Sequence, residues 1–144
     1  MAVEAVPARY GSITPYLVVV GAEKLVKFLE QAFGGVCVER VPGPTGALAH
    51  AEVKIGDSIV MLGEASERAK AYSATLYHYV PNVDEVHRRA VASGATVLTE
   101  PTDLFYGDRS GAVIDPCGNY WYIATHVEDV SSEEMQKRMQ AMKK

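Results

Sequence analysis

Apolar residues in the first half of the chain follow the period of strands in some segments and that of a helix in another. Four segments are rich in β-branched and other apolar residues, as strands are: residues 13–20, 36–41, 48–55 and 58–62. Between the first two, apolar residues recur at three- and four-residue spacing, at Leu25, Phe28, Leu29 and Ala32. This spacing predicts a helix over residues 22–33 and a β-α-β-β-β order for the first half.

The second half repeats this order. Asn82, with Glu85 three residues later, forms a capping box that predicts a helix over residues 83–93. Residues 101–109 are expected to form a loop. Strands are predicted on both sides of the helix and around a Pro- and Gly-containing turn at residues 115–119. They cover residues 75–80, 96–99, 111–114 and 120–125.

Matching positions in the two halves support an internal repeat. An offset of 61 residues aligns Tyr16 with Tyr77, and one of 62 aligns the turn at residues 56–57 with residues 118–119. We therefore predict an α+β fold in which two βαβββ units form one pseudo-symmetric domain. The predicted units are residues 13–64 and 74–126.

The two ends of the chain lie outside this repeat. Residues 1–12 are expected to be a loosely held arm. Ser131 and Glu134 form a second capping box, which predicts a C-terminal helix over residues 131–144. One side of that helix carries an apolar stripe of Met135, Met139 and Met142. This stripe and the short exposed edge strands favour a homodimer.

Composition excludes several classes of partner. The 144 residues carry a net charge of −4, so the chain lacks the basic surface that nucleic acid requires. No run approaches the roughly 18 apolar residues of a membrane span, and the N-terminus lacks a signal-peptide pattern. The 2 cysteines form neither a disulfide framework nor a metal motif. We expect a cytoplasmic protein that binds neither nucleic acid nor a membrane.

Three segments resemble a known family: residues 13–34 (ITPYLVVVGAEKLVKFLEQAFG), residues 80–94 and residues 115–123 (DPCGNYWYI). They are similar to the vicinal-oxygen-chelate superfamily, which includes glyoxalase I, bleomycin-resistance proteins and extradiol dioxygenases. Residues 106–135 look most like small bacterial proteins described as glyoxalase-like or phosphonate-operon-associated. The resemblance covers about residues 12–135 and implies that each unit curls into a half-barrel around a cavity.

In metal-dependent members of that superfamily, a divalent ion is held by residues on the first and last strands of both units. The resemblance carries these positions over to Thr14, Val60 or Met61, Thr75 and Tyr122. The two repeat offsets leave the choice between Val60 and Met61 open. None of these residues is a His, Asp or Glu, which Mn, Fe, Ni or Zn require. We therefore expect no metal and no other cofactor.

Tyrosines are the main side chains expected to line the cavity. The strand period of two puts residues on the same face as the positions carried over. A lining of this kind suits an aromatic or amphipathic small molecule, although the rings could instead simply fill a small barrel. The expected lining residues are Thr14, Tyr16, Met61, Thr75, Tyr77, Tyr79, Tyr120 and Tyr122.

Histidine and arginine side chains offer further candidates. His50 and Glu52 share a strand face and form an acid/base or ligand pair, or else a polar outer face. His78 is expected to face the helix layer as a hydrogen-bonded core residue, and His87 to be solvated beside two arginines. In the loop at residues 101–109, Tyr106 and Arg109 are expected at the cavity mouth.

Arg109 has two possible roles. The guanidinium can clamp a ligand carboxylate or phosphate, or it can be a structural pin held by Asp108 or Asp115. The favoured function is metal-free binding of a small molecule in a tyrosine-rich cavity, in the manner of bleomycin-resistance proteins. The alternative is a glyoxalase-like isomerase or lyase that uses His50 and Glu52 as its acid/base pair.

Overall fold

The computed structural model describes residues 2–143. The first unit consists of strand β1 (Tyr16–Val19), helix α1 (Ala22–Phe33) and strands β2 (Val36–Pro42), β3 (Leu48–Ile55) and β4 (Ser58–Glu64). The second consists of strand β5 (Thr75–Tyr79), helix α2 (Val83–Ala92) and strands β6 (Thr96–Asp103), β7 (Asp108–Ile114) and β8 (Tyr120–His126). Helix α3 (Ser132–Met142) follows them.

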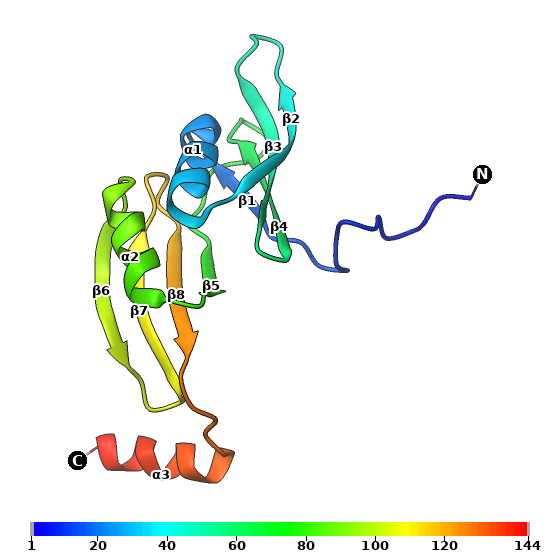
Figure 1. Ribbon diagram of the computed structural model, residues 1–144. Coiled ribbons are helices and arrows are strands. Elements are labelled where there is room, and N and C mark those ends of the chain that lie inside the picture. The colour runs from blue at the N-terminus through cyan, green and yellow to red at the C-terminus, as the bar shows by residue number, and fades with distance from the viewer. Residues whose placement is uncertain (1, 144) are drawn as a thin grey trace.

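Both units have the same sheet topology. The strand orders are β1-β4-β3-β2 and β5-β8-β7-β6, with the first strand of each unit parallel to its last and the other pairs antiparallel. The predicted α+β fold of two βαβββ units with a C-terminal helix is confirmed (Figure 1). None of the helices within residues 2–143 is long and apolar enough to cross a membrane.

The predicted loop at residues 101–109 is instead largely strand. β6 continues to Asp103 and β7 begins at Asp108, which leaves only residues 104–107 as a turn. This turn closes because the Leu104 N–H donates to the Asp108 carbonyl at 2.8 Å, and Gly107 supplies the positive φ of 100°. The sequence did not predict this extension because Pro101 and the polar residues around it resemble a loop.

Helix α1 begins without a side-chain cap of its own. Its N-terminal Gly21 and Ala22 donate backbone hydrogen bonds to the Glu64 carboxylate at 3.0 and 2.8 Å. Because β4 extends to Glu64 rather than ending at residue 62, a strand end caps the helix of the same unit and complements its dipole.

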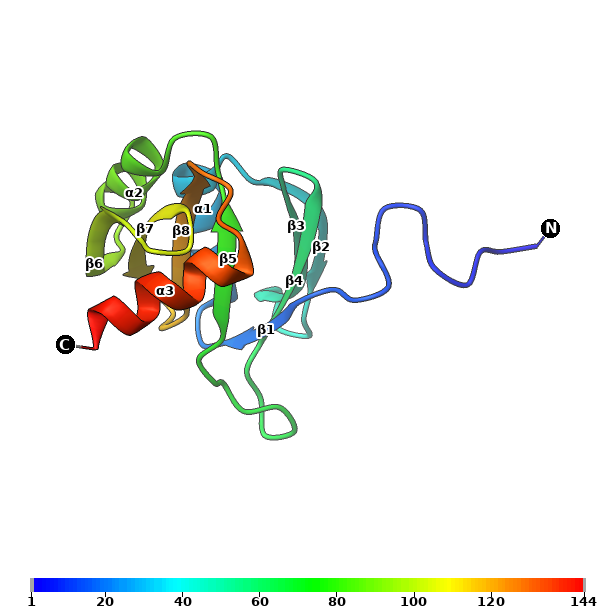
Figure 2. The ribbon, with the colours of Figure 1, turned by 90° about the horizontal axis from the view of Figure 1, so that it is seen from below.

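The core lies between the two sheets. Helix α1 occupies the angle between them, with α2 beside it (Figure 2). The buried side of α1 includes Leu25 and Phe28, and its last residue, Phe33, packs against Trp121 and His78 with ring centroids 4.9 and 4.7 Å apart. Since both sheets turn their helix sides toward this shared core, their opposite faces point away from it.

Candidate functional site

The faces of the sheets opposite the helices carry the candidate site. In the first sheet, Tyr16 pairs with Met61 and Met61 with Glu52, and these side chains and His50 form the first face. In the second sheet, Tyr77 pairs with Tyr122 in the equivalent register. The second face comprises Thr75, Tyr77, Tyr79, Tyr106, Asp108, Tyr120, Tyr122 and His126.

This register decides between Val60 and Met61. Tyr16 pairs with Met61 in the first sheet, and Tyr77 pairs with Tyr122 in the second. Adding 61 to the number of each residue in the first pair gives the second pair. Val60 points to the opposite side and is buried in the core. Met61 is therefore the equivalent of Tyr122. Thr14 lies just before β1, whereas Thr75 is the first residue of β5 and pairs with Tyr120.

A buried carboxylate organises the second face. Asp108 is 2% exposed, and its Oδ2 accepts hydrogen bonds from the Tyr77 and Tyr79 hydroxyls at 2.6 and 2.8 Å. Its Oδ1 lies 2.8 Å from His126 Nδ1, and His126 Nε2 lies 2.7 Å from Asp129 Oδ1. The two phenols are thus held by one group.

The protonation states follow from these contacts. Burial acts to raise the pKa of Asp108, but hydrogen bonds from Tyr77, His126 and Tyr79 lower it, and the pKa lies below its ordinary value. Hydrogen bonds to Asp108 and Asp129 raise the pKa of His126. Burial and the Asp108 carboxylate raise the pKa of Tyr77. Asp108 is therefore ionised and Tyr77 is a neutral phenol at neutral pH.

Two of the tyrosines on this face are open to solvent. Tyr77 is 44% and Tyr79 is 60% exposed, and the Tyr77 and Tyr122 rings stack nearly parallel with centroids 6.3 Å apart. Tyr77 and Tyr79 also border a cavity of about 400 Å³ along edge strand β5, whose apolar lining includes Leu76 and Trp121. The exposure of Tyr77 and Tyr79 favours an open cavity over the alternative of a barrel filled by tyrosine rings.

The first face is built differently, because Arg9 and Tyr10 of the N-terminal arm contact its buried carboxylate. Glu52 is 5% exposed and accepts hydrogen bonds from the Tyr10 hydroxyl and, at 3.1 Å, from the Arg9 guanidinium. His50 Nε2 lies 3.1 Å from Glu52, and His50 Nδ1 lies 3.3 Å from the Tyr16 hydroxyl. His50 and Glu52 lie on the face away from the helix, as one alternative predicted, but Glu52 is not solvated.

Arg109 does not lie at the cavity mouth but on the opposite side of the second sheet, next to α2. Because side chains alternate along β7, Asp108 faces the tyrosines and Arg109 faces α2. Its guanidinium bonds both Asp84 carboxylate oxygens at 2.9 Å and Asp103 at 3.3 Å. This is the geometry of a structural pin, although neither predicted partner, Asp108 or Asp115, holds it. Tyr106 does reach the second face, where its hydroxyl lies 3.2 Å from that of Tyr77.

Two other histidines differ from expectation. His87 is buried rather than solvated, and its Nε2 lies 3.0 Å from the Thr99 carbonyl. His78 faces the helix layer as expected, but within residues 2–143 its buried Nδ1 has no hydrogen-bond partner. Burial lowers the pKa of His78. The uncharged form of His78 is therefore favoured in the core.

The carried-over metal positions do not fit a transition metal. Thr14, Met61, Thr75 and Tyr122 offer hydroxyls and a thioether, without imidazole or carboxylate. Among the described residues, no three His, Cys, Asp or Glu side chains come together as a metal site. Cys117 is not an activated nucleophile either, because burial raises the pKa of its thiol to about 11.

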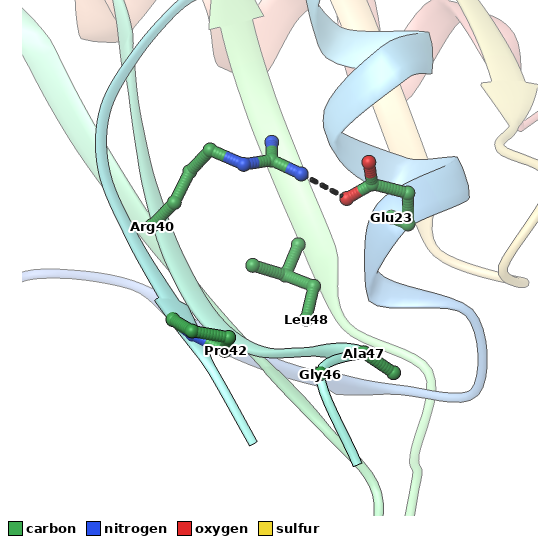
Figure 3. Close-up of a pocket in the computed structure, with 6 residues that line it drawn as sticks. All are labelled: Glu23, Arg40, Pro42, Gly46, Ala47 and Leu48. Carbon is green, nitrogen blue, oxygen red and sulfur yellow. Dashed lines mark hydrogen bonds and ion pairs between the residues drawn. The ribbon is translucent and has the colours of Figure 1, made fainter. Parts of the chain in front are cut away.

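A separate cavity of about 410 Å³ lies near the β2–β3 turn (Figure 3). Its two charged lining residues among those described, Arg40 and Glu23, are bonded to each other. Pro42 and Leu48 add apolar surface. Because its charges are already paired, this cavity offers little hydrogen-bonding specificity.

Two residues of the second face, Asp108 and His126, were not predicted from the sequence as site residues. Asp108 fell in the segment taken as a loop, where alternation assigns no face. His126 could have been found, because the period of two that placed Tyr120 and Tyr122 on one face also places Ala124 and His126 there.

Comparison with known proteins identifies the family to which this chain is similar. Residues 9–123 match the model of the Glyoxalase/Bleomycin resistance protein/Dioxygenase superfamily. An uncharacterized protein of Mycobacterium bovis, Mb0911c, is 35% identical over 150 residues, covering 96% of both chains. TioX from Micromonospora sp. ML1 is 27% identical, with a TM-score of 0.69 over 81% of this chain and all of its own. The PhnB protein from Bacillus cereus shares the fold at 17% identity, with a TM-score of 0.66 over 80% of this chain and 99% of its own.

Proposed function

Because this chain belongs to the glyoxalase/bleomycin resistance protein/dioxygenase superfamily, we propose that it binds a small aromatic molecule on the second face without a metal ion. One observation carries the proposal. The buried Asp108 carboxylate fixes the hydroxyls of Tyr77 and Tyr79, while the rings of both residues stay exposed. Fixed, exposed aromatic rings are typical of surfaces that bind ligands, because little conformational entropy is lost on binding.

The expected affinity follows from ring area. Covering about 100 Å² of apolar surface contributes about 2.5 kcal/mol, and an aromatic ligand adds its own buried surface to this. A favourable aromatic pair contributes about 0.5–1.5 kcal/mol more. The stacked Tyr77 and Tyr122 rings offer such a surface. Micromolar to millimolar binding is therefore expected for a single-ring probe.

A second copy of the chain completes the cavity in this proposal. A typical binding site encloses about 70–90% of its ligand, which an open face cannot do. Tyr16, at 46% exposed, and the α3 residues Met139 and Met142 are further exposed apolar groups that a homodimer would cover. Sedimentation at micromolar concentration should show a dimer, and a monomer alone would contradict this part of the proposal.

Indole provides a test of the binding function. Its binding to the full chain can be followed by saturation-transfer NMR. Tyr122→Ala should weaken binding by about tenfold, the effect of losing about 1.4 kcal/mol of ring contact. Tyr72→Ala is a matched control, because Tyr72 is an exposed tyrosine outside the second face. Equal loss in both variants, or no binding by the wild-type protein, would overturn the proposal.

An acid/base enzyme on the first face is the alternative. The observation that favours it is the chain of contacts from the exposed Tyr16 hydroxyl through His50 to the buried Glu52. A buried carboxylate that orients an imidazole next to a hydroxyl is an arrangement suited to proton transfer. The hemithioacetal of methylglyoxal and glutathione tests it. Turnover lost in His50→Gln would support the enzyme, and absence of wild-type turnover would exclude this reaction.

A further inference from the structure

We infer that the part of the second face formed by Tyr77, Tyr79 and Tyr106 selects ligands that donate hydrogen bonds, above all organic ammonium and guanidinium cations, and disfavours carboxylates and phosphates. The inference rests on the proposed binding function of that face. The sequence had suggested an anionic ligand held by Arg109. The hydrogen bonds observed on the second face favour a cationic ligand instead.

The direction of each hydrogen bond is fixed by Asp108. An ionised carboxylate can only accept, so Tyr77 and Tyr79 must each donate their single hydroxyl proton to its Oδ2. His126 Nδ1 likewise donates to Oδ1. Neither phenol has a proton left for a ligand.

The direction of the hydrogen bond is also fixed for a third phenol, that of Tyr106. Its hydroxyl lies 3.2 Å from the Tyr77 oxygen, whose own proton already belongs to Asp108. Tyr106 is therefore the donor of that bond. Three phenols have used their three protons inside the cluster, and the oxygens of Tyr79 and Tyr106 present only lone pairs outward. A ligand N–H or O–H can bond to them, whereas a ligand oxygen without a proton cannot.

The charges on the face favour the same ligands. Asp108 and Asp129 flank His126 on its two ring nitrogens, so the trio carries at least one net negative charge even when the imidazole is protonated. Arg109, next to Asp108 in sequence, is paired with Asp84 on the other side of the sheet. The ring faces also attract cations through their quadrupoles.

On the first face, a guanidinium of the chain itself, that of Arg9, occupies a comparable site. There the buried Glu52 carboxylate accepts from the Tyr10 phenol and from the Arg9 guanidinium. The Arg9 guanidinium lies 5.1 Å from the centre of the Tyr10 ring, a cation–π contact. A phenol on a buried carboxylate together with an organic cation is therefore an arrangement that this fold forms.

Four probes of one shape test the inference on the full-length protein. They are 2-phenylethylamine, 2-phenylethanol, its methyl ether and 3-phenylpropionate, which present a cation, a neutral donor, no donor and an anion. Affinities measured by NMR titration should fall in that order, with the amine about tenfold tighter than the carboxylate, as expected for a cation–π contact plus one hydrogen bond. The preference should weaken at high salt.

Variants assign the preference to the phenol oxygens. Tyr79→Phe keeps the ring and should weaken binding of the amine about threefold to tenfold relative to binding of the ether. Tyr72→Phe is the matched control and should change neither. Equal binding of all four probes, or tightest binding of the carboxylate, would overturn the inference and leave the binding function intact. Absence of binding by every probe, the ether included, would overturn the proposed function itself.

Discussion

Replacing Asp115 by alanine is expected to lower the free energy of unfolding by about 3–5 kcal/mol. This buried carboxylate organises the turn between β7 and β8. Its Oδ1 accepts from the backbone N–H of Cys117 at 2.7 Å and of Asn119 at 3.1 Å. Its Oδ2 accepts from the Asn119 side chain at 3.0 Å and from the Trp121 indole at 2.8 Å.

The magnitude comes from these four donors. A hydrogen bond to a charged group contributes about 1.5–3 kcal/mol, and a buried donor left without an acceptor costs about 1–3 kcal/mol. The four contributions are not additive, since they share one carboxylate and water can enter the turn. A loss of about 3–5 kcal/mol is still a large part of the roughly 5–15 kcal/mol that holds a domain folded.

Urea unfolding followed by far-ultraviolet circular dichroism measures this loss. Asp115→Asn keeps one acceptor oxygen and should fall between wild type and Asp115→Ala. Trp121→Phe removes a single donor of the network and some core volume, and provides a second comparison. A loss below about 1 kcal/mol for Asp115→Ala, with an unchanged m-value, would show that the Asp115 carboxylate does not hold this turn together.

Three further stability predictions follow from other contacts. Arg109→Ala should lower the melting temperature by about as much as Asp84→Asn and leave probe binding unchanged, which thermal melts and the NMR titration measure. The free energy of unfolding of the wild type should fall as the pH drops below 6.5. Burial lowers the pKa of His78 in the folded protein, so the unfolded chain takes up a proton more readily in this range. His78→Leu should reduce this fall, which urea titrations at several pH values measure. Gly111→Ala should cost about 1–3 kcal/mol by chemical denaturation, because the new Cβ would lie 2.8 Å from the Pro101 nitrogen.

The periodic parts of the sequence predicted the fold well. Leu25, Phe28 and Leu29 are buried on one side of α1 as their spacing required. The Asn82 side chain accepts from the Glu85 N–H at 3.1 Å, as the capping box predicted. These features depend on contacts within a few residues of one another, which local patterns can report.

The candidate site was harder to predict because its contacts join distant segments. Glu52 is buried by Tyr10, a residue 42 positions earlier. The choice between Val60 and Met61 required the pairing of β4 with β1. Arg109 was placed on the wrong side because the strand that contains it was taken for a loop. No local period encodes such long-range contacts.

A crystal structure of the protein grown with 2-phenylethylamine would show directly whether the second face binds an aromatic cation. Density is expected for the aromatic ring against Tyr77 and Tyr122, with the ammonium group within hydrogen-bonding distance of the Tyr79 oxygen. Density only in the cavity near the β2–β3 turn would contradict binding on the second face. So would a second face closed by side chains of another copy, with no space left for a ligand.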